Sequence, residues 1–421
     1  MNNPDPIVPK KSALSLFSGE SDESPFAIFA QMRAMGSVIS VPFPVAGADK
    51  QAWMVTRMEE AMRVLKDHTR FTVDPSTIDG HGDIRQTLAG GNPDPSAPPT
   101  FFTGSSMLSV DEPDHRRLRG LVSKVFTPRY MEGLRPRVQE IADELLDRVQ
   151  DQGEMDLVKD YAYPLPINVI SDMLGVPEAD REQIHVWSAA IAHGLGLGRR
   201  EPGVDEHLRA FGEYTAQLVA DKRRCPADDL ISRLIEMESE GDRLSEAELL
   251  SMITLLIFAG HETTSNLIAT GAFTLLDHPG QLEKLKSDLS LVPSAVEELL
   301  RFNGPATIAG PRFATEDLEL AGQAIKKGDI VIPVLKSANR DENQFTQPEE
   351  LDITRTIHRH LAFGQGIHMC LGAPLARVEG DIAFTTLLRR LPNLRLNVPR
   401  ESVAWSFTLS SQGITSLPVA F

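Results

Sequence analysis

Cysteine is scarce in this sequence. The 421 residues include two cysteines, Cys225 and Cys370, which is too few for the disulfide framework of a secreted scaffold. We therefore expect a reducing, cytoplasmic setting. In such a setting a cysteine stays available as a thiolate ligand.

Long apolar runs and an excess of positive charge are also missing. No uninterrupted apolar stretch of about 18 residues occurs, and a polar lead-in of about 25 residues replaces the apolar core of a signal peptide. The 59 acidic residues outnumber the 42 basic ones and give a formal net charge of -17, which disfavours contact with a phosphate backbone. The sequence thus predicts neither a membrane anchor nor a nucleic-acid partner.

Helical periodicity dominates residues 114–276. Ser245 and Glu248 form a capping-box pattern at the start of the longest helical stretch, and Pro279 ends it. The middle of this stretch is apolar on nearly all sides, which indicates a buried helix.

Shorter elements flank this region. Residues 51–56 alternate like a strand, residues 318–341 are rich in strand and loop signals, and a final helix is expected over about 374–391. Glycine and proline interrupt the pattern at 76–106 and 193–207, which predicts loops there. We expect a mainly α fold with a smaller β-rich part.

A glycine-rich segment surrounds Cys370 just before the final predicted helix. It reads FGQGIHMCLG from Phe363 to Gly372. Gly364 and Gly366 permit a tight turn and close backbone approach to a flat ligand, and Gly372 lets the following helix lie close. A cysteine at a helix N-terminus has its thiolate stabilised by backbone N–H groups.

The residues alone leave the role of Cys370 open. Its side chain could be a small apolar group in the core or a thiolate ligand of a cofactor. It could also complete a tetrahedral zinc site, whose other ligands would be His358, His360 and His368.

The segment FGQGIHMCLGAPLAR is similar to the cysteine-ligand loop of the cytochromes P450, F-G-x-G-x-H-x-C-x-G, and every fixed position is filled. Further family features follow in order from about residue 50 to residue 420, so the resemblance to soluble bacterial members covers nearly the whole chain. It implies a single domain over residues 1–421 with the cytochrome P450 fold. It also implies a noncovalently bound haem b with Cys370 as the axial ligand of the iron.

A second motif lies inside the longest predicted helix. The residues AGHETT, from Ala259 to Thr264, resemble the family pattern A-G-x-[DE]-T. Small residues could serve helix packing and threonines could bond the carbonyl one turn back, but a buried glutamate has no such simple structural explanation. The resemblance implies that Ala259 and Gly260 line the oxygen site and that Glu262 and Thr263 deliver protons, with Thr264 as a weaker candidate.

The resemblance also assigns roles to charged residues. Haem propionates need cationic partners, and the matching positions are His115, Arg119, Arg312, His360 and His368. Spacing alone makes Glu298 and Arg301 no more than a helical surface pair. In the family this pair is buried and supports the cysteine loop, with a further arginine that Arg355 would supply.

The implied activity is that of a monooxygenase that inserts one oxygen atom from O2 into a small apolar organic substrate. NAD(P)H would supply electrons indirectly, through a ferredoxin or flavodoxin with its reductase, which would dock beside Arg116 and Arg117. The glycine-rich stretches at 76–106 and 193–207 would cover the substrate. Its pocket would draw on Leu256, Ile257, Ala306, Thr307, Ile308, Ala309, Thr408 and Leu409.

Two other functions agree with parts of the pattern. A peroxide-driven peroxygenase would need no electron partner, but such enzymes commonly replace the acid–threonine pair. A noncatalytic P450-like domain that binds a carrier protein would tend to lose the cysteine loop or the oxygen motif. Both motifs are intact in this sequence.

Overall fold

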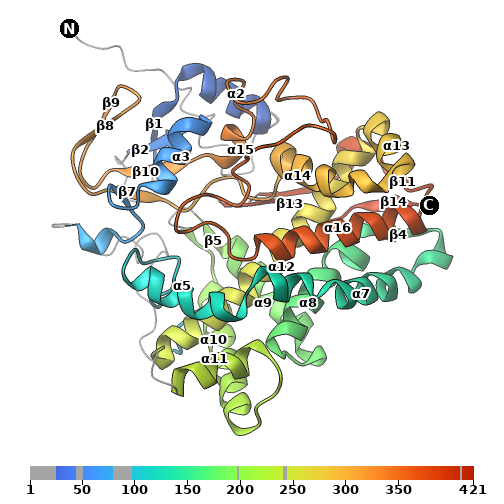
Figure 1. Cartoon of the computed structure of the whole chain (residues 1–421), viewed down its shortest axis with the longest axis horizontal. Coiled ribbons are helices and arrows are strands. Elements are labelled where there is room, and N and C mark those ends of the chain that lie inside the picture. Colours follow the sequence, from blue (N-terminus) through green and yellow to red (C-terminus); the bar gives the residue numbers. More distant parts are fainter. Residues whose placement is uncertain (1–24, 44–50, 79–96, 197–198, 240–243, 408–409) are drawn as a thin grey trace.

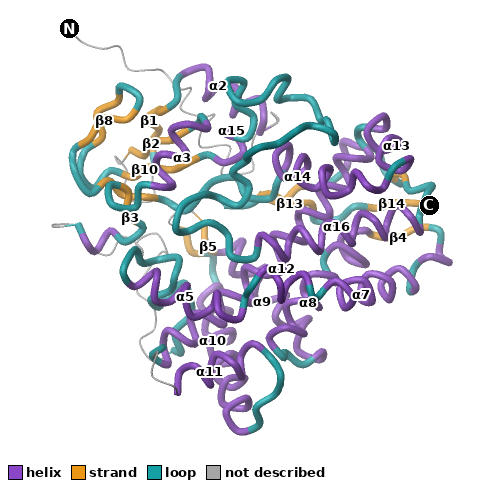
Figure 2. The backbone as a smooth tube through the Cα atoms, viewed as in Figure 1, coloured by secondary structure: helices purple, strands orange, loops and turns teal. Residues whose placement is uncertain are grey.

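The computed structural model describes residues 25–43, 51–78, 97–196, 199–239, 244–407 and 410–421. Helices make up most of these residues and fill the lower and right-hand parts of Figure 2, whereas the largest sheet lies at the upper left. The α-helices are α2 (Pro25–Met35), α3 (Met58–Lys66), α5 (Asp114–Val125), α6 (Pro128–Glu132), α7 (Arg135–Asp147), α8 (Pro164–Leu174), α9 (Arg181–Gly194), α10 (Val204–Arg224), α11 (Leu230–Ser239), α12 (Glu246–Leu276), α13 (Pro279–Ser287), α14 (Val292–Asn303), α15 (Leu335–Ala338) and α16 (Ala373–Arg390). Short helical turns are η2 (Pro75–Thr77), η3 (Gln150–Gln152), η4 (Val158–Ala162), η5 (Glu178–Asp180), η6 (Leu289–Leu291) and η7 (Arg400–Ser402).

Helix α12 is the centre of the helical part and packs against α8, α10, α14 and α16 (Figure 1). Its start is the predicted capping box, in which the Ser245 hydroxyl accepts the Glu248 N–H and the Glu248 carboxylate accepts the Ser245 N–H. Small residues bring its neighbours close. A Cβ atom at Gly260 would lie 2.6 Å from Cγ1 of Ile170 on α8, and one at Gly271 would lie 2.6 Å from the Phe384 ring on α16.

The five-stranded sheet has the order β1-β2-β10-β7-β3. Only β2 and β10 pair in parallel among these neighbours, in a register that sets Ala52 opposite Ile330. Alternate residues of β2 enter different apolar clusters, Ala52 and Met54 on one face and Val55 on the other, as the period of a strand requires. The strands of this sheet are β1 (Val38–Pro42), β2 (Gln51–Val55), β3 (Phe71–Thr72), β7 (Arg312–Ala314) and β10 (Ile330–Pro333).

The remaining strands form small sheets, of which the β8–β9 hairpin lies beside the five-stranded sheet. One sheet has the order β11-β14-β4, and three hairpins pair β5 with β6, β8 with β9 and β12 with β13. Their bounds are β4 (Glu154–Asp156), β5 (Leu195–Gly196), β6 (Arg199–Arg200), β8 (Leu318–Leu320), β9 (Gln323–Ile325), β11 (Arg395–Leu396), β12 (Trp405–Phe407), β13 (Gln412–Ile414) and β14 (Pro418–Ala420).

Of the two predicted loops, 193–207 contains regular elements, whereas the described part of 76–106 is mostly irregular. The stretch 193–207 contains the end of α9, the β5–β6 hairpin and the start of α10. Of the stretch 76–106, residues 79–96 lie outside the described part, and residues 97–106 have no regular element. Within the described ranges, no helix is long and apolar enough to cross a membrane.

Candidate functional site

A cavity of about 410 Å³ separates α12 from the segment that leads into α16. Cys370 lies deep in the protein but is exposed to this cavity, which also borders Ala259, Gly260 and Thr263 of α12. The two motifs recognised in the sequence, more than a hundred residues apart in the chain, therefore face one space.

The cysteine segment is held by backbone hydrogen bonds and by two left-handed glycines. Cys370 N–H donates to the Phe363 carbonyl at 2.9 Å, and Gly364 N–H donates to the Leu361 carbonyl at 2.9 Å. Gly364 and Gly366 have φ of +67° and +80°. A Cβ atom at Gly366 would lie 2.1 Å from the Leu65 carbonyl oxygen at the end of α3, so only glycine fits this turn.

The Cys370 thiol faces the N-terminus of α16. Burial raises the pKa of the thiol, whereas the backbone N–H groups of Gly372 and Ala373 and the charge of Arg119 lower it. Coordination to a metal ion removes a thiol proton outright, and the two N–H donors then stabilise the sulfur anion.

Two arginines border the same cavity, and neither forms an ion pair with the residues that the structure describes, although the charge of Asp111 lies close enough to interact with Arg312. Arg119 donates to the Met369 carbonyl at 2.6 Å, and Arg312, which is 6% exposed, donates to the Gly310 carbonyl at 2.8 Å. Burial lowers the pKa of Arg312 to about 10. A buried cation bonded only to neutral carbonyls indicates that an anion belongs beside it.

Two histidines extend this group. The rings of His115 and His368 meet edge to face, 4.4 Å between centroids. His368 Nε2 lies 3.2 Å from an Asp111 carboxylate oxygen, but its Nδ1 and Nε2 of His115 are buried without a hydrogen-bond partner. Burial lowers the pKa of His115 to about 4, and an anion beside these nitrogens would both accept their N–H groups and offset that cost.

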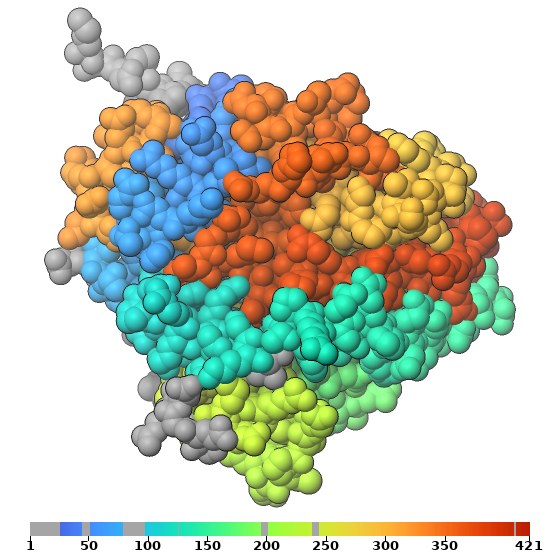
Figure 3. Space-filling view, viewed as in Figure 1, coloured from blue at the N-terminus to red at the C-terminus, as the bar shows by residue number. Residues whose placement is uncertain are grey.

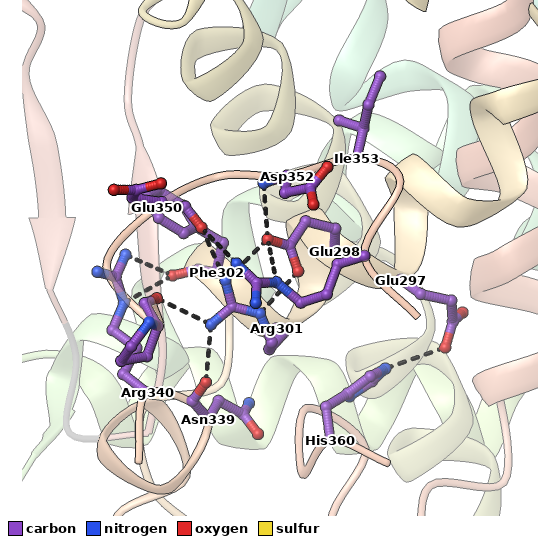
Figure 4. Close-up of polar contacts among 12 residues, drawn as sticks. Glu297, Glu298, Arg301, Phe302, Asn339, Arg340, Glu350, Asp352, Ile353 and His360 are labelled. Atoms are coloured by element: carbon purple, nitrogen blue, oxygen red, sulfur yellow. Dashed lines mark hydrogen bonds and ion pairs between the residues drawn. The ribbon is translucent and has the colours of Figure 1, made fainter. Parts of the chain in front are cut away.

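His360 lies elsewhere. Its Nε2 is 3.0 Å from the Glu297 carboxylate, and its Nδ1 accepts the Ala362 N–H (Figure 4). Unlike Arg119, Arg312 and His368, it does not border the cavity, and its predicted contact with a propionate stays a prediction. His115 does not border the cavity either, but its ring contacts that of His368. Nor do His358, His360, His368 and Cys370 assemble, because the described residues contain no group of three potential metal-ligating side chains.

The Glu298–Arg301 pair is fully buried, with no exposed side-chain area on either residue. Two carboxylate–guanidinium hydrogen bonds of 2.7 and 2.8 Å join them, and Arg355 adds a third at 3.1 Å. Figure 4 shows Arg301 reaching the backbone carbonyls of Asn339 and Glu350, so this cluster connects α14 to the chain that precedes the cysteine segment.

The predicted acid and alcohol face different spaces. Thr263 borders the Cys370 cavity, as does the buried Thr264, and the Thr263 hydroxyl donates to the Ala259 carbonyl at 3.2 Å. Glu262 instead lines a second cavity of about 970 Å³. Burial raises the pKa of its carboxyl, although His193 and a hydrogen bond from Ser411 lower it.

The predicted substrate-pocket residues divide into three groups. Leu256, Ala306 and Ala309 border the Cys370 cavity. Ile257 and Ile308 are core residues and the Thr307 backbone bonds to Ser410, so none of these three borders it. Thr408 and Leu409 lie outside the described residues.

Two acidic residues near the cavity were not identified from the sequence. Asp111 bonds His368, and its position three residues before the DHRRLR motif was a usable signal. Glu379 on α16 borders the cavity, is 1% exposed, and burial raises the pKa of its carboxyl to about 8. No sequence pattern distinguishes it from a surface glutamate.

Comparison with known proteins agrees with this architecture. The cytochrome P450 family model matches residues 204–409. The polyketide biosynthesis cytochrome P450 PksS of Bacillus subtilis (strain 168) is 41% identical over 95% of this chain and 96% of its own. Cytochrome P450 monooxygenase PikC of Streptomyces venezuelae is 40% identical over 94% of this chain and 90% of its own. The crystal structure of the myxobacterial cytochrome P450 CYP267B1 with myristic acid has a TM-score of 0.87 and 40% identity, covering 97% of this chain and 98% of that one.

The mainly α architecture with a smaller β-rich part is therefore the cytochrome P450 fold, as predicted. The likeness extends over nearly the full length of proteins named as P450 enzymes. The chain belongs to the cytochrome P450 family and is an oxidoreductase of the monooxygenase class.

Proposed function

We propose that this protein is a haem-thiolate monooxygenase that binds haem b noncovalently in the Cys370 cavity. The observation that carries the proposal is the arrangement of a thiol at the N-terminus of α16 beside buried cations and histidine nitrogens that lack an anionic partner. A flat ligand with an iron centre and two carboxylates fits this donor set.

Each predicted cofactor residue has a role in this proposal. The Cys370 sulfur would bind the iron, and Phe363, Gly364 and Gly372 would line the site on the cysteine side. Arg119, Arg312, His115 and His368 would hold the propionates, whereas the hydrogen bond between His360 and Glu297 would support the cysteine segment from behind. When bound, haem with a thiolate ligand supplies the activation of molecular oxygen.

On the opposite side, Ala259 and Gly260 leave space for dioxygen, because neither carries a side chain longer than a methyl group. Thr263 holds a proton at Oγ1 next to that space, and Glu262 replaces this proton from its own cavity. The presence of both residues favours an O2-dependent reaction over the peroxide-driven alternative.

The cluster of Glu298, Arg301 and Arg355 is a structural support. Its ion pairs and carbonyl contacts hold the chain before the cysteine segment against α14. The whole chain, residues 1–421, would then act as a single domain, because α12 lies at its centre and contacts helices from both halves of the sequence.

The substrate is a small apolar organic molecule. The cavity wall provided by Leu256, Ala306 and Ala309 offers no charged group. Myristic acid in the CYP267B1 structure supports this substrate class. Ile257, Thr307 and Ile308 would support the wall from behind, and Thr408 and Leu409 remain predicted members of the pocket.

Electrons would come from NAD(P)H through a ferredoxin or flavodoxin and its reductase. Helix α5, with its basic residues, and the segment before α16 share the face shown in Figure 3. Met369, which belongs to that segment, is 39% exposed. Arg116 is 77% exposed although it pairs with Glu112. An acidic partner would dock on this face by charge complementarity.

Isotope labelling tests the proposal. With ferredoxin, its reductase, NADPH and ¹⁸O2, an oxidised product of an apolar probe such as myristic acid should contain one ¹⁸O atom. Oxygen derived from water would contradict the proposal, and so would turnover that requires added peroxide and ignores the electron partner.

A further inference from the structure

The second cavity leads from the protein surface to Glu262. Its inner wall includes Glu262 and His261 of α12, and its outer wall includes exposed residues such as Arg148 and Lys159. Helices α8 and α9 and the β12–β13 hairpin form its sides. A buried carboxyl and the solvent therefore border the same polar space.

The β12–β13 hairpin lies directly over the Glu262 face of α12. Asn266 follows Glu262 by four residues and so lies on the same helix face. A Cβ atom at Gly413 would be 2.0 Å from the Asn266 Oδ1 atom, so the hairpin backbone touches this face. Ser411, just before β13, donates a hydrogen bond to Glu262.

His193 is a residue of α9 that contacts this hairpin. It is exposed and lies in the last turn of α9, where its Nδ1–H donates to the Ala189 carbonyl at 2.8 Å. Because this bond occupies Nδ1, Nε2 is the nitrogen available to a partner on the hairpin. Nε2 lies 2.7 Å from the Ser406 hydroxyl on β12.

Other titratable groups line the cavity, but burial disfavours charge on those nearest to Glu262. Burial lowers the pKa of His261 to about 4 and also lowers the pKa of His185. Burial raises the pKa of Tyr163, so its hydroxyl stays protonated. The other charged residues of the wall are Arg137 and Glu144 of α7, Asp172 of α8, Arg181 and Glu182 of α9, Lys159 of η4, Asp156 of β4, Glu178 of η5 and Arg148. Among the histidines of this wall, His193 is the exposed one.

We propose that His193 supplies protons from solvent to Glu262, with the Ser406 hydroxyl as the carrier. The inference rests on the proposed role of Glu262. The Nε2 proton passes to Ser406 Oγ while the serine proton passes to water in the cavity, and the Glu262 carboxylate takes up a proton from that water. An imidazolium and a carboxylate thus become a neutral imidazole and a neutral carboxyl, and solvent at the mouth of the cavity returns a proton to Nε2.

The competing explanation is that His193 has only a structural role, because its contact with Ser406 also holds the hairpin against α9. The two roles differ in what they change. Loss of a structural contact would move the hairpin against α12, which lines the Cys370 cavity, and so would alter substrate affinity. Loss of a proton carrier leaves affinity unchanged, slows the proton-dependent step and increases its sensitivity to D2O.

The test compares His193→Gln, Ser406→Ala and Glu262→Gln in the haem-loaded enzyme, with His185→Gln as a matched control on the same helix and cavity. Myristic acid serves as the probe, and the readouts are its spin-shift Kd, the fraction of NADPH electrons found in product, and the solvent isotope effect on turnover. His193→Gln should lower coupled turnover by roughly tenfold, raise the isotope effect and leave Kd unchanged. Ser406→Ala should do the same, and His185→Gln should match the natural enzyme.

The double variant His193→Gln/Glu262→Gln should be no worse than Glu262→Gln alone, because both residues serve one path. Additive losses, or a change confined to Kd, would overturn the role of His193. If Glu262→Gln itself leaves coupling intact, the proposed function of Glu262 fails. If only Glu262→Gln lowers coupling, the inference about His193 fails and the proposed function stands.

Discussion

The substitution Glu298→Gln should destabilise the support of the cysteine segment. The Glu298 carboxylate accepts hydrogen bonds from Arg301, from Arg355 and, at 2.9 Å, from the Asp352 N–H. Glutamine keeps the shape of the side chain but replaces one acceptor oxygen with an amide NH2 that faces guanidinium N–H groups. The Arg301 charge would then be buried without a counter-ion.

Removing one partner of a buried ion pair costs about 3–5 kcal/mol. This is a large share of the roughly 5–15 kcal/mol by which folded domains are stable. Displacement of Arg301 would also release its bonds to the carbonyls of Asn339, Pro348 and Glu350. Urea unfolding followed by circular dichroism should show the loss as a lower midpoint, and the purified variant should retain less haem.

Glu297→Gln is the matched control, because it makes the same change at the neighbouring residue of α14. Glu297 is 30% exposed and pairs with Arg377 at 2.6 Å and His360 at 3.0 Å. Water reaches this pair, so we expect Glu297→Gln to cost less stability than Glu298→Gln. Equal losses in the two variants would refute the argument that burial makes the Glu298 cluster a support.

Three further predictions follow from the site. Thr263→Ala should divert electrons from product to hydrogen peroxide, with coupled turnover reduced roughly tenfold, whereas Thr274→Ala, which removes only a bond to the Thr270 carbonyl, should leave coupling unchanged. Gly366→Ala should lower haem retention because the new Cβ would clash with the Leu65 carbonyl. Gly153→Ala is the control, because Gly153 has a φ of +74° but open space around the new Cβ. This control should lose only the stability that the backbone strain costs, about 1–2 kcal/mol. Burial raises the pKa of the Glu297 carboxyl, but hydrogen bonds from His360 and Arg377 lower it more, from 4.5 to about 2. The contribution of Glu297 to stability is therefore complete above pH 4.5 and is lost as the pH falls towards 2. Acid unfolding of Glu297→Gln should depend less on pH in that window than acid unfolding of the natural protein.

Local patterns account for the parts of the fold that the sequence predicted well. The Ser245–Glu248 capping box and Pro279 mark the ends of α12 because they act within one turn of the helix. The glycine spacing of the cysteine segment likewise reflects a tight local turn. The β5–β6 hairpin was missed because strands of two residues leave no periodic signal.

The arrangement of the site depends on contacts between distant segments, which spacing cannot reveal. Glu262 and Thr263 are adjacent in the sequence, yet they line different cavities, because α8, α9 and the β12–β13 hairpin enclose one side of α12. His360 lies three residues before the cysteine segment and bonds to Glu297 of α14, sixty-three residues away in the sequence. Whether such a side chain lines a cavity or supports the backbone depends on the segments that pack against it, and these are distant in the sequence.

The most direct test of the central claim is the absorption spectrum of the purified protein, reduced with dithionite, before and after addition of carbon monoxide, with Cys370→Ser measured beside it. The proposal predicts the strongly red-shifted carbonyl band of a thiolate-ligated haem in the natural protein and its loss in the variant. A protein that binds no haem, or a Cys370→Ser variant that keeps the band, would contradict the assignment of Cys370 as the iron ligand.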